Sequence, residues 1–187
     1  MSGGLVLHLV VVAAVGAERL LELVIARRNL NAVAARGGFV AETRTFWDTA
    51  VLQVVWLAAC AVEPILVERP FIAPLAALAI ALLIACQALR YWAVLTLGDR
   101  WNLRIVVVPG EAVVTRGPYR FVRHPNYLAV LVEFLALPLV HTAWITAAVF
   151  FALAVPVTAR RVRLEELALA RHSDYEHAFA GRPRVLP

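Results

Sequence analysis

The residues RGPYRFVRHPNYLAVL, numbered 116–131, place arginines, a histidine, an asparagine and two tyrosines directly before a long apolar run. Pro125 suits the first turn of a helix, because the N–H that proline lacks has no partner there anyway. A helix is therefore predicted to begin at Pro125, with His124 just ahead of it and Asn126 and Tyr127 in its first turn. Free backbone N–H groups and the helix dipole make such an end a good place for a carboxylate or a phosphate. The alternative is a juxtamembrane cluster that contacts lipid headgroups.

Composition indicates an integral membrane protein. The chain has 187 residues, of which 62% are hydrophobic, and its mean hydropathy is +0.77. Soluble domains have a lower apolar fraction, and several apolar stretches here reach the length that crosses a bilayer. We expect one domain over 1–187. The N-terminus lacks a basic region and a cleavage site close behind its apolar run, so the first stretch is interpreted as a retained span.

Five apolar segments can be drawn along the chain. They cover approximately residues 5–25, 46–67, 71–97, 125–140 and 142–159. The first three are long enough to span the membrane alone, since about 20 apolar residues cross the hydrocarbon. The last two are shorter and meet near His141, which predicts a short helical hairpin. The expected fold is an all-α integral membrane protein with five transmembrane segments and a cytoplasmic C-terminal helix from about 158 to 180.

The arginines predict the orientation. The formal net charge is +5, and all 18 basic residues are arginines. Fifteen of them gather in three parts of the chain, 27–44, 100–123 and 160–184, which lie on one side of the membrane if the N-terminus is outside. The positive-inside rule then places the C-terminus in the cytoplasm and the protein in the inner (plasma) membrane. This explanation of the charge makes nucleic acid an unexpected partner.

No metal site is expected from the sequence. Cys60 and Cys86 lie singly in apolar runs, without the spacing of metal ligands. The connection over 98–123, by contrast, is predicted to be structured. It contains two short extended pieces, 105–108 and 112–115, around the turn residues Pro109 and Gly110.

A second polar constellation lies in RRVRLEELALARHSDYEHAF, residues 160–179. Adjacent Glu165 and Glu166 follow the arginines there. A solvated helix with internal ion pairs would explain them, but paired acids on the same side as the His124 cluster also suit a zwitterionic ligand. Glu133, inside a predicted span, is a functional candidate for its position alone. The same holds for four residues near the cytoplasmic ends of the first and third spans, unless they pair with one another: Glu18, Glu22, Gln87 and Arg90.

GPYRFVRHPNYL at 117–128, followed by RLEELAL at 163–169, closely resembles the isoprenylcysteine carboxyl methyltransferase family of integral-membrane enzymes that use S-adenosylmethionine. The shared elements are Gly-Pro-Tyr, Arg-His-Pro-x-Tyr at 123–127, the glutamate pair and Tyr175, and they cover about the C-terminal half. Two positions depart from the family pattern. Ala129 stands where a glycine is often found, and Phe179 stands where a second tyrosine is common.

The resemblance implies a cofactor site mainly within residues 98–187. It assigns cofactor binding to His124, Asn126, Tyr127, Tyr119, Arg123 and Glu166, and catalysis to Arg161, Glu165 and Asn102. Glu165 or Glu166 would hold the ammonium of S-adenosylmethionine, and Arg161 would lie near the acceptor. Asn102 and Arg104, in WNLR, are the best candidates from the connection for lining the same site. Methyl transfer is an in-line displacement that depends on alignment, and an acceptor that is already ionised needs no general base.

The acceptor is expected to be a lipid within the bilayer. ERLLELVIARRN at 18–29 resembles a bacterial branch of the family associated with polyketide lipids. This points to O-methylation of an alkylpyrone or alkylresorcinol, or of the carboxylate of an isoprenylcysteine-like lipid. Two alternatives remain open. One is a membrane reductase that uses NADPH, since sterol reductases have a similar His-Pro-x-Tyr pocket, and the other is a non-catalytic lipid-binding protein.

Overall fold

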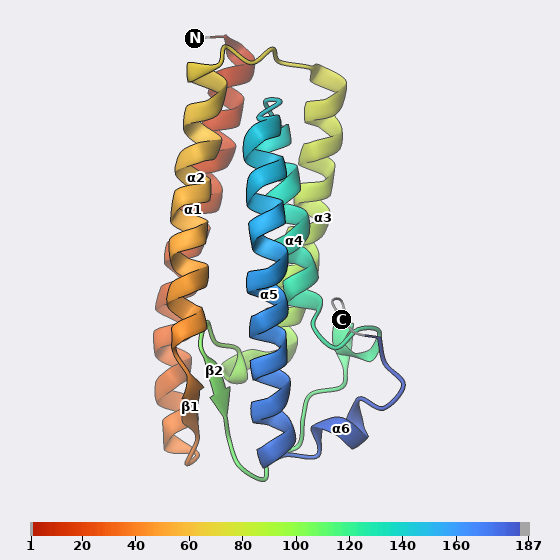
Figure 1. Cartoon of the computed structure of the whole chain (residues 1–187). Coiled ribbons are helices and arrows are strands. Elements are labelled where there is room, and N and C mark those ends of the chain that lie inside the picture. Colours follow the sequence, from red (N-terminus) through yellow and green to blue (C-terminus); the bar gives the residue numbers. More distant parts are fainter. Residues whose placement is uncertain (1, 184–187) are drawn as a thin grey trace.

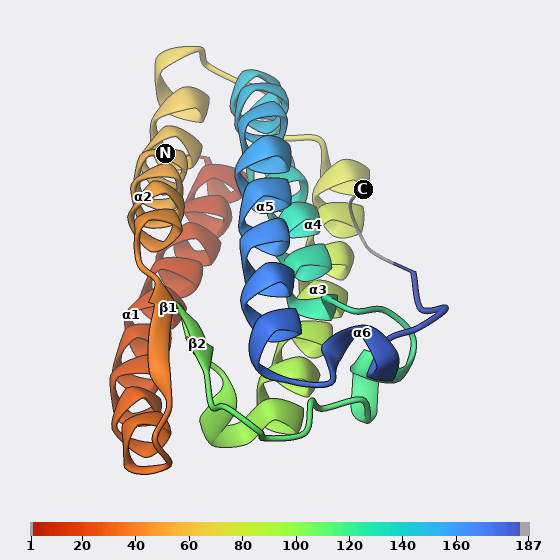
Figure 2. The ribbon, with the colours of Figure 1, turned by 60° about the horizontal axis from the view of Figure 1, so that its bottom comes forward.

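Five long helices run side by side in the computed structural model, which describes residues 2–183 (Figure 1). They are α1 (Gly3–Ala35), α2 (Arg44–Leu66), α3 (Ala73–Leu97), α4 (Pro125–Leu139) and α5 (Trp144–His172). The shorter elements are β1 (Phe39–Glu42), the 3-10 helices η1 (Gly98–Arg100) and η2 (Gly117–Arg120), β2 (Ile105–Val107) and α6 (Tyr175–Ala178). All these short elements gather at one end of the bundle (Figures 1 and 2).

Three helices among the described residues are long and apolar enough to cross a membrane: α2, α3 together with η1, and α5. The protein is therefore a membrane protein by length and composition of its helices. α4 has 15 residues and is shorter than a span usually requires. The count of five segments and the orientation of the termini stay predictions.

The C-terminal half of the bundle corrects two sequence-based boundaries. The predicted short fifth segment and the first part of the predicted tail helix form one continuous helix, α5, of 29 residues. The tail is not helical as far as Ala180, because α5 ends at His172. Ser173 adopts an extended backbone, and its N–H and hydroxyl both donate to the Leu169 carbonyl, which closes the helix end.

The expectation of an all-α fold was incomplete, because β1 and β2 form a small antiparallel sheet. Phe39 lies opposite Val107 and Val40 opposite Val106, with an irregularity before Glu42. The predicted extended piece at 105–108 is thus largely confirmed as a strand. Its partner, however, is the segment that follows α1, and the piece at 112–115 forms no strand. Gly110 at the turn instead donates its N–H to the His172 carbonyl at the end of α5.

α4 is the centre of the core. Its partners across the bundle are α3 and α5, and the Phe134 ring lies 4.6 Å from the Trp56 ring of α2. Ala129 is fully buried in this core, so a small residue still allows close packing where the family often has glycine. The position of α4 fixes the position of its N-terminus, which is where the polar cluster of the sequence lies.

At the end of the bundle opposite the sheet, the Glu63 carboxylate caps α5. It accepts hydrogen bonds from the backbone N–H of Ile145 (3.3 Å) and Thr146 (2.6 Å), and Arg69 pairs with it at 2.9 Å. A helix leaves its first N–H groups without partners, and a carboxylate near them also interacts favourably with the helix dipole. One buried acid of α2 therefore anchors the helix that carries Glu165 and Glu166.

We expect Glu63→Ala to destabilise the fold by about 1–2 kcal/mol, because the start of α5 loses its capping oxygens. Thermal unfolding of the purified protein in detergent measures this. Glu176→Ala is the matched control, since Glu176 is an exposed acid in the tail. Equal melting temperatures for the two variants would contradict the capping role.

Candidate functional site

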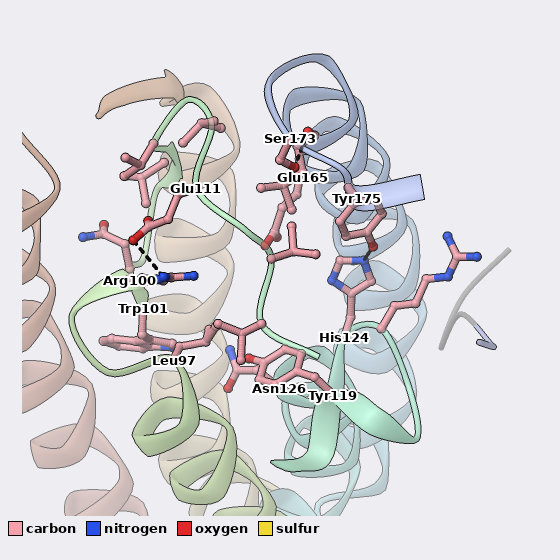
Figure 3. Close-up of a pocket in the computed structure, with 18 of the residues that line it drawn as sticks. Leu97, Arg100, Trp101, Glu111, Tyr119, His124, Asn126, Glu165, Ser173 and Tyr175 are labelled. Carbon is pink, nitrogen blue, oxygen red and sulfur yellow. Dashed lines mark hydrogen bonds and ion pairs between the residues drawn. The ribbon is translucent and has the colours of Figure 1, made fainter. Parts of the chain in front are cut away.

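A cavity lies at the end of the bundle where the short elements gather (Figure 3). Most of its lining comes from three parts of the chain, and Val33 of α1 and Leu97 of α3 complete it. The connection after α3 contributes Trp101, Asn102, Arg104 and Glu111, and the segment leading into α4 contributes Tyr119, Arg123, His124, Asn126 and Tyr127. The end of α5 and the tail contribute Glu165, Leu169, Ser173, Tyr175 and Phe179.

The structure brings the residues singled out in the sequence to one place. Of the nine residues to which a role was assigned, seven line the cavity: Asn102, Glu165, Tyr119, Arg123, His124, Asn126 and Tyr127. Arg104, expected to line the same site, does so as well. Arg161 and Glu166 are not among the lining residues. Both are buried behind it and contact side chains that do line it, so their geometry favours acting through neighbours.

His124 forms a buried cluster with Glu166 and Tyr175. The ring Nε2 lies 3.1 Å from Glu166 Oε1 and 3.2 Å from the Tyr175 hydroxyl, and that hydroxyl donates to Glu166 Oε1 at 3.1 Å. Burial raises the pKa of Tyr175, and the Glu166 carboxylate raises it further. The hydroxyl therefore stays protonated and holds the carboxylate in place.

A second chain of hydrogen bonds joins Tyr127, Glu165 and Arg161. The Tyr127 hydroxyl donates to Glu165 Oε2 at 2.5 Å and accepts from Arg161 Nε at 2.8 Å. The guanidinium also donates to the Thr45 hydroxyl at 3.4 Å and to the Leu103 carbonyl. Arg161 thus ties α5 to α4, to the start of α2 and to the connection after α3.

Glu42, which precedes α2, holds Thr45 in position for this contact. Its carboxylate accepts from the Thr45 hydroxyl and from the backbone N–H of Arg44 and Thr45. Burial raises the pKa of Glu42, but these hydrogen bonds together lower it by more, so the net shift is downward. The carboxylate stays ionised near neutral pH. By accepting from the Thr45 hydroxyl, it orients that hydroxyl to accept from Arg161.

The last turns of α1 hold the connection that forms one cavity wall. Asn29 donates to the carbonyls of Gly98 (3.3 Å) and Trp101 (2.7 Å), and Asn102 donates to the Ala26 carbonyl (2.8 Å). The amide nitrogen of Asn102 is consequently hydrogen-bonded to α1, although the residue lines the cavity. α1 extends ten residues beyond the expected end of the first segment, at residue 25, and this extension makes these contacts possible.

Gly117 allows the chain to approach α3 closely before Tyr119. It adopts a positive φ of 59°, and a Cβ there would clash with the side chain of Thr96. Only glycine meets both requirements without strain. The turn that follows buries Tyr119 against the cavity, where burial and then Glu165 raise the pKa of its hydroxyl.

Sequence reasoning missed part of the cavity. Arg100 pairs with Glu111 at 2.7 Å at the cavity wall, and Arg36, at the end of α1, reaches the same carboxylate at 3.5 Å. Trp101 and Phe179 add aromatic surface. The position of Glu111 beside the predicted Pro109–Gly110 turn could have indicated its role. No sequence pattern, however, predicts its pairing with Arg36, which is 75 residues away.

The chemistry of the cavity suits an organic ligand with a cationic group and a flat apolar part. Glu165 supplies a carboxylate, whereas Glu111 is paired with Arg100 and Arg36. Trp101, Leu169 and Phe179 supply apolar walls. Asn126 Oδ1 is buried and has no hydrogen-bond partner within residues 2–183, so the cavity has an acceptor to offer. The same described residues contain no group of three or more histidine, cysteine or acidic side chains that could hold a metal ion.

Comparisons with known proteins identify the family of the chain. Residues 78–171 match the model of the isoprenylcysteine carboxyl methyltransferase (ICMT) family. The chain is 30% identical over 156 residues to the uncharacterized protein YpbQ of Bacillus subtilis, covering 83% of this chain and 92% of that protein.

An uncharacterized protein of Haemophilus influenzae is 26% identical over 159 residues, which cover 84% of this chain and 92% of that protein. No solved structure matches the chain. The family match covers half of the chain, from α3 through both glutamates of α5, and so includes most of the cavity wall. The protein therefore belongs to the isoprenylcysteine carboxyl methyltransferase family and is a membrane methyltransferase.

Proposed function

We propose that this protein transfers a methyl group from S-adenosylmethionine to an oxygen of a lipid within the bilayer. The observation that carries the proposal is the cavity itself. It places a carboxylate, Glu165, and an unpartnered acceptor, Asn126 Oδ1, beside an apolar wall at the end of a helix bundle of membrane-spanning length. S-adenosylmethionine combines an ammonium, a sulfonium and an adenine, which these surfaces complement.

Residues of all three walls would hold the cofactor. Glu165 would accept from its ammonium, and the start of α4 beside His124, at the positive end of the helix dipole, would receive its carboxylate. Trp101 and Phe179 would cover the adenine, with Asn126 Oδ1 as a hydrogen-bond acceptor. Tyr119, Tyr127 and Arg123 would complete the boundary. Glu166 would act from behind by fixing His124 and Tyr175.

The bound cofactor supplies an electrophilic methyl group whose leaving thioether is neutral. The protein's contribution is then alignment and exclusion of water, which can lower a barrier by several kcal/mol. Arg161 keeps Tyr127 and Glu165 in one geometry, so we assign it a positioning role beside the acceptor. Asn102 fixes the connection against α1. No general base is required if the acceptor oxygen is already ionised.

The absence of a general base favours acceptors whose oxygen is ionised, or easily ionised, near neutral pH. An alkylpyrone has an acidic enolic hydroxyl that is ionised near neutral pH, whereas the phenolic hydroxyl of an alkylresorcinol must first lose its proton to solvent. In both, the alkyl tail would lie among the helices while the oxygen meets the cavity. The carboxylate of an isoprenylcysteine-like lipid satisfies the same condition. We favour the polyketide lipids, because the sequence at 18–29 resembles the branch associated with them.

S-adenosylmethionine is expected to raise the melting temperature of the protein in detergent, because a ligand that binds only the native state stabilises it. Glu165→Gln should weaken binding about tenfold or more, since an ammonium loses a charged partner. Calorimetry measures the affinity, and Glu176→Gln is the control. Stabilisation by NADPH instead would favour the reductase, and stabilisation by neither ligand would favour a non-catalytic protein.

The C-terminal tail supports the cavity from outside. Arg182 donates to the carbonyls of Tyr119 (3.1 Å) and Thr115 (3.4 Å), and its guanidinium lies 5.1 Å from the centre of the Phe179 ring. Its own carbonyl accepts from Arg123 Nε at 2.9 Å. One residue that does not line the cavity therefore contacts three residues that do.

We expect Arg182→Ala to raise the KM for S-adenosylmethionine several-fold while kcat changes little, because the cavity boundary loosens without loss of a reacting group. Arg182→Lys should recover little, since an ammonium does not reproduce two directed contacts and ring stacking. Arg171→Ala, an exposed arginine of α5, is the control. A fall in kcat with unchanged KM would contradict this role.

Purified protein with labelled S-adenosylmethionine tests the acceptor on a panel that differs in headgroup. The panel contains an alkylpyrone, an alkylresorcinol, a farnesylcysteine analogue and phosphatidylethanolamine. We expect label in the alkylpyrone or the alkylresorcinol, identified by mass spectrometry. Label in the farnesylcysteine analogue alone would move the assignment to the prenylated carboxylate, and label in the phospholipid alone would rule out both proposed acceptors.

A further inference from the structure

Arg104 differs from the other arginines that line the cavity, because its guanidinium has no polar partner. Arg100 pairs with Glu111 at 2.7 Å, and Arg123 donates to the Arg182 carbonyl at 2.9 Å. Among the residues that the structure describes, the Arg104 guanidinium has neither a hydrogen bond nor an ion pair. Arginine keeps its charge at any ordinary pH. A positive charge without a counter-charge therefore lines the cavity.

The Arg104 guanidinium lies over an aromatic ring at the start of α2. Its central carbon is 5.4 Å from the centre of the Phe46 ring, and the Phe46 ring meets the Trp47 ring at 5.1 Å. Trp47 is 61% exposed, and α2 is one of the helices of membrane-spanning length. Tryptophan at the end of such a helix is typical of the membrane–water interface. Arg104 thus lies between the cavity and the side from which a lipid would arrive.

The reaction proposed for the cavity requires a positive charge near the acceptor. Methyl transfer forms an O–C bond while the C–S bond breaks, and the electron pair of that bond stays on sulfur. An anionic acceptor and a sulfonium therefore give two neutral groups, and no proton has to be removed. An anion that leaves water for the cavity needs a cationic partner in return.

Arg161 is poorly suited to be that partner. Its three side-chain nitrogens already donate, to the Tyr127 hydroxyl, the Thr45 hydroxyl and the Leu103 carbonyl. It also lies behind the cavity wall and not in it. Arg104 lines the cavity with all its side-chain donors available. A guanidinium presents these donors as a planar fork, which suits an anionic oxygen.

We propose that Arg104 binds the anionic headgroup of the lipid acceptor and that the protein selects lipids whose negative charge is shared between two oxygen atoms. One oxygen then stays with the guanidinium while the other receives the methyl group. The enolate of an alkylpyrone and a carboxylate both have such a charge. The phenolate of an alkylresorcinol shares its charge with ring carbons instead. This inference rests on the proposed function and narrows its substrate class.

The carboxylate of S-adenosylmethionine is a less suitable ligand for Arg104. This carboxylate and the ammonium are bonded to the same carbon atom, so the two groups bind close together. Glu165 of α5, which would hold the ammonium, forms no ion pair with Arg104 among the described residues. The Arg104 guanidinium instead reaches Phe46 of α2. The position of Arg104 therefore favours the acceptor over the cofactor.

Equilibrium binding to the purified protein in a neutral detergent tests the proposal. The two probes are an alkylpyrone with a free ring hydroxyl and its neutral O-methyl ether, without S-adenosylmethionine, near neutral pH. Arg104→Gln should weaken binding of the hydroxypyrone about tenfold or more and leave binding of the ether unchanged, because only the anion loses a charged partner. Arg104→Lys should recover part of the affinity. Arg116→Gln, at an exposed arginine of the same connection, is the control.

Two further measurements complete the test. Calorimetry should give the same affinity for S-adenosylmethionine in wild type and Arg104→Gln. With labelled S-adenosylmethionine, the wild type should have a higher kcat/KM for the alkylpyrone than for an alkylresorcinol with the same tail. The melting temperature of Arg104→Gln should change little, because its guanidinium has no hydrogen bond to lose.

Equal affinity of wild type and Arg104→Gln for the hydroxypyrone would overturn the proposal, as would a preference for the alkylresorcinol. If Arg104→Gln loses affinity for S-adenosylmethionine and keeps it for the hydroxypyrone, Arg104 holds the cofactor carboxylate and the proposal is wrong. The proposed function fails separately, if the wild type binds no S-adenosylmethionine. The comparison of the two probes would still decide whether Arg104 binds an anion.

Discussion

The buried guanidinium of Arg161 is the constraint on which the arrangement of the site depends. A charged group away from water must find hydrogen-bond partners, and Arg161 finds them on three separate segments. Tyr127 belongs to α4, Thr45 to α2, and the Leu103 carbonyl to the connection after α3. If one segment moved, the guanidinium would lose a partner. The three walls of the cavity are therefore fixed relative to one another by a single side chain.

The same solution recurs at a different depth of the bundle. Inside the bundle, Arg19 of α1 and Arg90 of α3 both pair with Glu133 of α4, where apolar packing would leave the relative rotation of the helices less defined. Lipid offers no hydrophobic force to drive helices together, so polar contacts and close packing specify their arrangement. Helix association in this protein thus combines the apolar core around Phe134 with directed polar contacts at two levels.

Local features of the structure were predictable from the sequence, and long-range pairings were not. Pro125 marked the start of α4, and the lining residues that were predicted all lie in segments whose polarity departs from their surroundings. The pairing of β1 with β2 was missed because its strands are 4 and 3 residues long and lie far apart in the chain. The burial of Arg161 and Glu166 behind the cavity was also missed, since helix periodicity gives a face but not the neighbour that covers it.

The continuity of α5 restricts how this protein can change in length. A single helix of 29 residues joins the Glu63 cap at one end of the bundle to the paired glutamates at the other. Adding one residue between them would rotate everything beyond it by about 100° around the helix axis. Glu165 would then leave the cavity, and Glu166 would lose His124. Insertions and deletions among relatives should accordingly fall in the connections between elements, while the interval from Thr146 to Glu166 keeps its length.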